Sequence, residues 1–367
     1  MIYIYLFIIL FLMGLVDIFL DDANVKKILL CVMGFVFVLI SGLRWESGTD
    51  WVNYINYFNG NSSFNDFFKV DDFEVGYRLL NYVVKVFSDK YTALLLALAF
   101  LSIIPKLWSF TNFKYFLVIL FGYYCVFEAD IFAVRQCIAL GFSAIGIYFI
   151  VKRQLYGFLL MILIGMLFHW TILGFIPAYF LYGLKNFRTI GMVLIVIALA
   201  AWLMNLQQVI FNLALSKFSS VDPDSKLGSQ LFLYSQQSDD FDQLSKLGVL
   251  SRVVMILYFW ALSIFKPEDK LLNGFLNIYI VGFVIYVVLG ASFIVFVRLS
   301  WYYTYIEIFL IAYSLSFFKT RFDRCLVYFV FTLYFAARLN QVITSQADLK
   351  VPLYFIWDNS HRTFNNE

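Results

Sequence analysis

Long apolar runs, separated by short polar connections, limit the possible folds of this chain more than any other feature of its sequence. Charged residues make up 14% of its 367 residues and hydrophobic residues make up 62%, whereas a soluble globular domain carries about 25% charged residues. A helix needs about 20 apolar residues to cross the ~30 Å hydrocarbon core of a bilayer, so the length leaves room for roughly a dozen spans and little else. The sequence therefore predicts an all-α polytopic integral membrane protein, in which residues 1–367 form a single domain with about 12 transmembrane helices.

Basic residues in the connections predict which side of the membrane each connection faces. They occupy every second connection, and short basic loops face the cytoplasm. Strict alternation then places both termini outside and leaves two long outer loops, at about residues 44–88 and 205–248. The predicted spans lie near residues 2–20, 28–43, 89–107, 115–129, 131–150, 155–168, 170–184, 189–204, 249–265, 271–296, 299–318 and 325–340. The basic connections carry Lys26, Lys27, Lys106, Lys114, Lys152, Arg153, Lys185, Arg188, Lys266, Lys270, Lys319, Arg321 and Arg324.

Two segments differ from simple spans. Residues 154–184 form either one long tilted helix or a hairpin that turns at residues 168–170, and the hairpin places His169 at the outer face. The segment from Val75 to Phe87 has apolar residues at helical spacing, but it is short and contains two basic residues. It therefore predicts an amphipathic helix that lies in the membrane interface.

The connection after residues 28–40 gathers charged, aromatic and small residues at the membrane boundary. It reads Gly42-Leu43-Arg44-Trp45-Glu46-Ser47-Gly48-Thr49-Asp50-Trp51-Val52-Asn53-Tyr54. Arg44 and Glu46 lie where a predicted span meets water, and charge at that depth is costly and indicates a functional site. The alternative is an interfacial arginine that snorkels between belt tryptophans.

Further short motifs follow this run in order along the chain. They are Glu74-Val75-Gly76-Tyr77, Arg135-Gln136, Phe168-His169-Trp170, and Arg298 with Tyr302 or Tyr303. Together with the run at residues 42–54, these motifs resemble the signature of the EpsG family, the Wzy-like membrane polymerases of bacterial exopolysaccharide and O-antigen assembly. The chain departs from the family pattern after Phe-His, where a small hydroxyl residue is usual and Trp170 stands here, followed by Thr171.

The resemblance implies a membrane glycosyltransferase that polymerises polyprenyl-diphosphate-linked oligosaccharide repeat units, as O-antigen or exopolysaccharide. The site would face the outside of the bacterial inner (plasma) membrane and would use neither a metal nor a cofactor. The implied partners are the lipid-linked donor and acceptor, membrane lipid, and a chain-length regulator protein. No nucleic acid is expected as a partner, because the basic residues are scattered rather than clustered.

Two other functions remain open from the sequence. One is a flippase or transporter of lipid-linked oligosaccharide, and the other is an O-antigen ligase-type transferase. A flippase needs polar residues through the bilayer midplane, whereas the charged residues here crowd the outer ends of the predicted spans. The distribution of charge therefore favours an enzyme with an outer site.

Arginines at the predicted outer ends of spans are candidates for binding the substrate diphosphate. Guanidinium groups fork onto phosphate oxygens and stay charged when partly buried. The candidate substrate-binding residues are Arg44, Arg135, Gln136, Arg298 and Tyr302. The alternative for Arg135 and Arg298 is an intramembrane salt bridge. The carboxylates that could form it are Glu128, Asp130 and Glu307.

Glycosyl transfer also needs a group that helps to deprotonate the acceptor hydroxyl, and a carboxylate or a histidine does this best. The candidate catalytic residues are His169, Glu74 and Asp50, and Glu128 competes with the other carboxylates for the role of base. The alternative for His169 is an interfacial histidine bonded to the backbone. The chain has two histidines, so a His-based metal site is not expected, and it has no nucleotide-binding motif.

Overall fold

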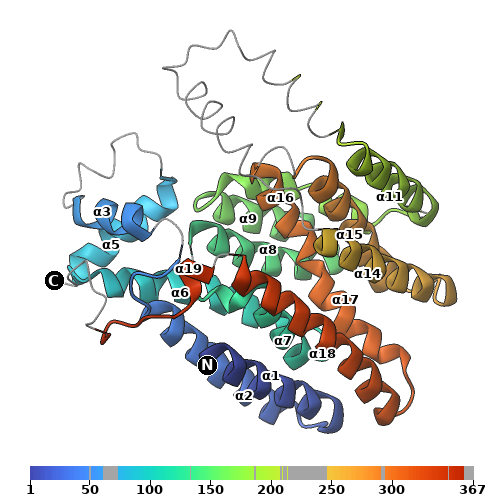
Figure 1. Cartoon of the computed structure of the whole chain (residues 1–367), viewed down its shortest axis with the longest axis horizontal. Helices are drawn as coiled ribbons and strands as arrows, with labels where there is room; N and C mark the ends of the chain where they lie inside the picture. The colour runs from blue at the N-terminus through green and yellow to red at the C-terminus, as the bar shows by residue number, and fades with distance from the viewer. Residues whose placement is uncertain are drawn as a thin grey trace. The chain divides into compact units, whose positions relative to one another are not determined.

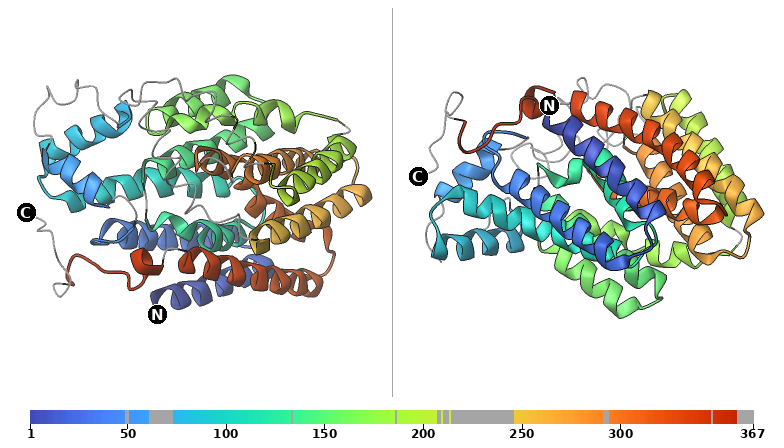
Figure 2. Two further views of the ribbon diagram at one scale, coloured as in Figure 1. Left: turned by 45° about the horizontal axis from the view of Figure 1, so that its top comes forward. Right: turned by 90° about the horizontal axis from the view of Figure 1, so that it is seen from below.

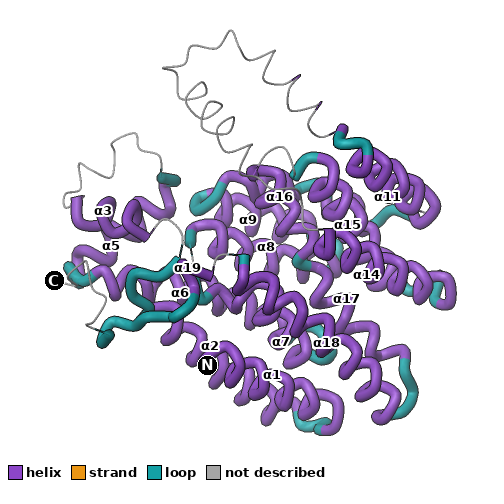
Figure 3. Tube along the Cα trace, in the orientation of Figure 1, coloured by secondary structure: helices purple, strands orange, loops and turns teal. Residues whose placement is uncertain are grey.

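Helices account for nearly all of the secondary structure in the described part of the chain (Figure 1). The computed structural model describes residues 1–48, 51–60, 73–132, 134–185, 187–206, 246–290, 294–345 and 347–358, together with residues 209 and 213. Within these ranges the only β-pairing is an isolated antiparallel bridge between Arg44 and Phe355, and Figure 3 shows helices joined by loops. The predicted all-α class is confirmed for the described residues.

The chain divides into two compact units. Unit 1 comprises Met1–Leu173 and Ile311–Glu367, and unit 2 comprises Gly174–Leu310. The helices of unit 1 are α1 (Ile2–Phe19), α2 (Ala23–Gly42), α3 (Trp51–Gly60), α5 (Val75–Phe87), α6 (Tyr91–Phe110), α7 (Phe116–Phe127), η1 (Glu128–Asp130), α8 (Arg135–Val151), α9 (Leu155–Met166), η3 (Leu315–Phe317), α18 (Arg321–Thr344) and α19 (Ala347–Lys350). Those of unit 2 are α10 (Ala178–Tyr182), α11 (Phe187–Leu203), α14 (Lys246–Phe265), α15 (Lys270–Val288) and α16 (Ile294–Thr304). The two unit boundaries fall within η2 (Trp170–Phe175) and α17 (Ile306–Ser314).

Seven helices among the described residues are long and apolar enough to cross a membrane. They are α1, α2, α6, α14, α15, α18 and the segment Val295–Phe317. The apolar helices α8, α9 and α11 have only 10–17 residues, fewer than the about 20 that a perpendicular span needs. The structure thus has the helices of a membrane protein, while the count of about twelve spans stays a prediction. The predicted outer loop at 205–248 lies almost entirely outside the described residues.

The short helix α7 lies at the centre of unit 1. Its residues Phe116 to Cys125 are all buried, and it contacts α1, α2, α6 and α18 (Figure 2). Asp17 of α1 caps it, since the Asp17 carboxylate accepts the backbone N–H of Leu117 at 2.7 Å. A carboxylate is stabilising there because a helix N-terminus presents unsatisfied N–H groups and the positive end of the helix dipole. This contact explains an acidic residue inside the otherwise apolar α1.

Three consecutive residues with left-handed backbone end α7, although the predicted span continued to residue 129. Glu128, Ala129 and Asp130 have φ values of 52°, 49° and 56°. Non-glycine residues in this conformation are strained, and the surrounding structure must hold them there. Two buried lysines do so, because Lys350 pairs with Glu128 and Lys106 pairs with Asp130.

The predicted amphipathic helix is confirmed as α5, with the bounds that the apolar spacing indicates. One side of α5 contributes buried residues to unit 1, including Tyr77 and Asn81. The other side exposes Val75, Leu79, Val83, Val86 and Phe87. An exposed apolar stripe of this kind is what a helix in the membrane interface presents to lipid.

The segment 154–184 is not one long helix. The helix α9 ends at Met166 and η2 begins at Trp170. Turn hydrogen bonds join Phe168 and His169 to the carbonyl of Gly165, both at 3.0 Å. The chain therefore turns at residues 167–169, which overlaps the turn at residues 168–170 of the hairpin alternative.

Candidate functional site

The segment at residues 43–48, which follows α2, carries the first arginine of the site. Gly48 has a φ of 98°, a conformation that side-chain-bearing residues rarely adopt. Arg44 pairs with Phe355 in the isolated bridge, and the backbone N–H of Trp45 donates to the carbonyl of Tyr354 at 2.9 Å. The backbone around Arg44 is thus fixed by a segment from the far end of the chain.

The Arg44 guanidinium is buried rather than directed into solvent. Only 4% of the residue is exposed, and its Nη1 donates to the carbonyl oxygen of Ser41 at 2.6 Å. Burial lowers the pKa of Arg44 to about 10, because desolvation penalises the charged form. A snorkelling arginine would place this group in water, so the burial favours the functional alternative.

The second arginine, Arg135, begins α8 and is held by a carboxylate and by aromatic rings. It forms an ion pair with Glu74, and its Nε donates to the hydroxyl of Tyr54 at 3.3 Å. The guanidinium lies over the rings of Phe73, at 4.6 Å from the centroid, and Tyr77, at 5.8 Å. Stacking on rings leaves the edge of a guanidinium open to further hydrogen bonds.

Glu74 and Tyr77 are placed by a close approach of two helices. The backbone N–H of Gly76 donates to the carbonyl of Leu167 at 2.7 Å. A Cβ at residue 76 would lie 2.7 Å from that same oxygen, so only glycine allows the contact. The motif Glu74-Val75-Gly76-Tyr77 thus has a physical reason. Gly76 allows α5 to pack against the end of α9, which places Glu74 beside Arg135 and Tyr77 in the cavity wall.

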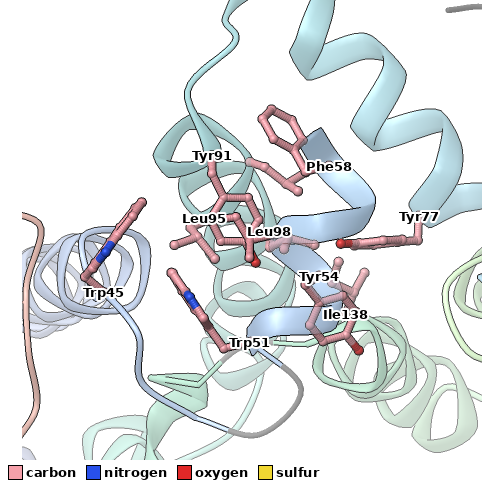
Figure 4. Close-up of a cluster of buried hydrophobic side chains, with 11 residues drawn as sticks. Trp45, Trp51, Tyr54, Phe58, Tyr77, Tyr91, Leu95, Leu98 and Ile138 are labelled. Carbon is pink, nitrogen blue, oxygen red and sulfur yellow. The ribbon is translucent and has the colours of Figure 1, made fainter. Parts of the chain in front are cut away.

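Arg44 and Arg135 line one narrow cavity. Its other lining residues are Ser47, Trp51, Tyr54, Tyr77, Tyr91, Leu95, Leu98 and Val134. Figure 4 shows how Trp51 and Tyr54 of α3, Tyr77 of α5 and Tyr91 of α6 gather in one buried cluster. Two cations in an aromatic enclosure can hold an anion next to a flat, partly apolar group.

Trp51 adds a polar group to this wall. The residue is 6% exposed, and its Nε1 has no hydrogen-bond partner among the described residues. An indole N–H is a donor only, and a buried donor without an acceptor is costly. An oxygen of a ligand in the cavity would satisfy it.

Of the other predicted residues, Gln136 and His169 do not line the cavity. Gln136 is buried beside Arg135, and Asp50 is outside the described residues. His169 is buried, with Nδ1 2.7 Å from the hydroxyl of Thr171. It follows the carbonyl of Leu167 that docks Gly76, so the turn with His169 packs against the segment with Glu74. In the family a small hydroxyl residue usually follows the histidine directly. Here Thr171, one position later, brings its hydroxyl to His169.

Arg298 and Tyr302 belong to unit 2, so their relation to the cavity stays a prediction. Arg298 is partly buried on α16. Tyr302 is fully buried and packs on the ring of Phe175, with centroids 6.2 Å apart. The neighbouring Tyr303 donates its hydroxyl to the carbonyl of Gly174 at 2.6 Å, which fixes α16 to the start of the unit.

The predicted alternative partners of Arg135 are engaged elsewhere. Glu128 pairs with Lys350, and Asp130 pairs with Lys106. The salt bridge of Arg135 to either residue is therefore wrong, because its partner is Glu74. The pairing of Glu128 with a buried lysine also weakens its case as the base. The predicted place of Lys106 in a cytoplasmic connection is wrong, because Lys106 is buried within α6. Nothing in the sequence indicated a role for Lys350, and the only signal for both lysines was a lysine between apolar neighbours.

No group of three or more His, Cys, Asp or Glu side chains that could hold a metal occurs among the described residues. The use or absence of a metal stays a prediction, because several acidic residues lie outside that part of the chain, namely Asp50, Asp71, Asp72, Asp239, Asp240 and Asp242.

Comparison with known proteins supports the family that the motifs resemble. No curated protein and no solved structure matches the chain. The family model of the EpsG family matches residues 27–355, nearly the whole chain. This range includes Arg44, Glu74, Arg135, His169 and Arg298. The chain therefore belongs to the EpsG family, a family of Wzy-like polymerases.

Proposed function

We propose that this protein polymerises polyprenyl-diphosphate-linked oligosaccharide repeat units, as O-antigen or exopolysaccharide, at the outer face of the bacterial inner membrane. Membership of the EpsG family supports a polysaccharide polymerase. The observation that carries the proposal is the cavity that Arg44 and Arg135 share with an aromatic wall. A diphosphate next to a sugar matches both parts of this lining.

The cavity would receive the head of the lipid-linked donor. The cavity is narrow in this structure, with room for about one water molecule, so the diphosphate and its first sugar would have to widen it on binding. Arg44 would bind phosphate oxygens in a desolvated setting, where charge-assisted hydrogen bonds are strong. Trp51 and the tyrosines would contact the sugar. Arg298 and Tyr302 are further substrate-binding candidates on α16.

The ion pair between Arg135 and Glu74 suggests how donor binding prepares the base. Phosphate oxygens would compete with Glu74 for the Arg135 guanidinium, and the displaced carboxylate would then be able to accept a proton. The acceptor hydroxyl oxygen would bond to the anomeric carbon of the donor sugar. The bond from that carbon to the diphosphate oxygen would break, and polyprenyl diphosphate would leave with the bonding electrons. The hydroxyl proton would pass to Glu74, with His169 and Asp50 as the other candidate bases.

The experiment that tests the function compares surface glycan and lipid-linked units in a strain that lacks the protein. A polymerase defect leaves surface glycan with a single repeat unit or none, while lipid-linked single units still reach the outer face. A flippase defect would trap those units on the cytoplasmic side, and a ligase defect would leave long polymer on its lipid carrier. Gel analysis of the glycan and the sidedness of the lipid-linked unit separate these outcomes. Long lipid-linked polymer in the deletion strain would exclude the proposed function.

A further inference from the structure

The C-terminal strap, residues 347–358, lies along the segment that carries Arg44. Gly48 donates its backbone N–H to Leu349 O at 2.9 Å, and Trp45 donates to Tyr354 O at 2.9 Å. In the opposite direction, Ile356 of the strap donates to the carbonyl of Leu43 at 3.0 Å. These bonds hold residues 43–48 along their length, and Arg44 and Ser47 of this segment line the cavity.

Lys350 anchors the strap in the core of unit 1. Its Nζ lies 2.8 Å from Oε1 of Glu128 and donates to the carbonyl of Val342 at 2.8 Å. The Lys350 side chain is 8% exposed and the Glu128 side chain 7%. The hydroxyl of Tyr3 donates to the carbonyl of Lys350 at 2.9 Å. Lys350 is thus tied to α1, to the left-handed turn after α7 and to the end of α18.

We infer that Lys350 is a positioning residue of the active site, which acts through the C-terminal strap to hold Arg44 in the substrate cavity. This inference rests on the proposed function. Lys350 is adjacent to Leu349, whose carbonyl binds Gly48, and it does not line the cavity. Without this anchor, the strap no longer holds the backbone of residues 43–48 by hydrogen bonds. The Arg44 guanidinium is then no longer held in the cavity.

The proposal can be separated from a general loss of stability by removing both charges. A single change such as Lys350→Met leaves the Glu128 carboxylate buried without its counter-ion, which is strongly destabilising. The double variant Lys350→Met/Glu128→Gln removes that penalty, since neutral replacements of buried ion pairs are often tolerated. It still lacks the ionic anchor. The matched control is Lys26→Met/Asp17→Asn, which neutralises another lysine–carboxylate pair of unit 1, 2.9 Å apart, that has no bond to the strap. The asparagine oxygen can still accept the backbone N–H of Leu117 that Asp17 caps.

The first measurement is hydrogen exchange of the full-length protein in nanodiscs, which does not depend on activity. In the Lys350→Met/Glu128→Gln variant the amides of Trp45 and Gly48 should exchange faster than in the wild type, and those of α2 should not change. The control variant should show wild-type exchange at both amides. Unchanged protection of Trp45 and Gly48 in the double variant would overturn the proposal.

The second measurement is polymer formation from purified lipid-linked repeat units in liposomes. The double variant should raise the KM for the repeat unit by roughly tenfold or more, with a smaller effect on kcat, because a misplaced binding group weakens substrate binding. A KM equal to that of the wild type would also overturn the proposal. A wild-type protein that forms no polymer would instead contradict the proposed function, while the exchange measurement would still report on the anchor.

Discussion

Arg44 and Arg135 enter the same cavity under different constraints. Arg44 is buried on a backbone segment that the C-terminal strap holds. Arg135 begins a helix, pairs with Glu74 and lies over the ring of Phe73. Under the proposed function the group has to be planar in both places, either to fork onto phosphate oxygens or to stack on a ring. An ammonium group offers a point charge without this plane.

Arg44→Lys and Arg135→Lys should therefore each reduce polymer formation by about a hundredfold, the loss seen when one preorganised hydrogen-bond donor is removed from an active site. The measurement is the length and amount of surface glycan at matched protein level. Arg321→Lys is the control, because this arginine is half exposed and pairs with Asp21, away from the cavity. Wild-type chain length in either cavity variant, at normal membrane insertion, would mean that the residue does not bind the donor.

Residues of short motifs could be predicted from the sequence as parts of the site. The distant residues that form ion pairs in and around the site could not. Arg44, Arg135 and Glu74 stand in motifs that the sequence displays, and the structure brings Arg135 and Glu74 into contact. Lys350 pairs with Glu128, which lies 222 positions away in the sequence. No local sequence pattern predicts such a pair. Its burial follows from the left-handed turn at Glu128, which the apolar sequence of α7 does not signal.

Among the helices, α5 and α9 show how a motif positions the cavity wall. The amphipathic spacing predicted α5 because one side of the helix is buried within unit 1 and the other side is apolar and exposed. The sequence did not predict that the end of α9 receives α5 at Gly76. That contact depends on the turn at residues 167–169, for which the sequence left two alternatives. The structure excludes the single long helix, because α9 ends at Met166.

Gly76→Ala should destabilise the protein by about 1–3 kcal/mol, as expected when a methyl group is forced into a filled contact, and should reduce activity by moving Glu74 and Tyr77. The added Cβ would lie 2.7 Å from the carbonyl of Leu167, and that backbone oxygen cannot move aside cheaply. Thermal unfolding in detergent and the polymerisation assay report the two effects. Gly60→Ala is the matched control, since no atom of the described residues lies within 4 Å of a Cβ there. Equal melting temperatures for the two variants would contradict this account of the motif.

For the whole molecule, two contacts within unit 1 are consistent with the predicted sidedness of the loops. The Lys106–Asp130 pair is not, because it joins a residue assigned to the cytoplasm to a residue of an outer connection. The strap bonds to residues 43–48, so the C-terminal end and the first outer loop lie on one side, as the charge rule requires. Arg321 pairs with Asp21 at 2.6 Å, and both belong to connections assigned to the cytoplasm. Composition predicted the membrane class because so few charges remain. It could not fix the number of spans, because helices such as α7 are shorter than a bilayer and are held by packing.

Reporter fusions test the sidedness on which the outer site depends. A reporter that is active only outside the cytoplasm should work when fused after Ser220 or at the C-terminus, and a cytoplasmic reporter should work after Lys152. The reason is that basic connections stay in the cytoplasm, and the connection with Lys152 and Arg153 is basic. Each site should carry both reporters, so that an inactive fusion is distinguished from an unstable one. Because the strap holds the Arg44 segment, a cytoplasmic signal at the C-terminus would place the cavity on the cytoplasmic side. Exported lipid-linked units could not reach it there, and the proposed polymerase site would be excluded.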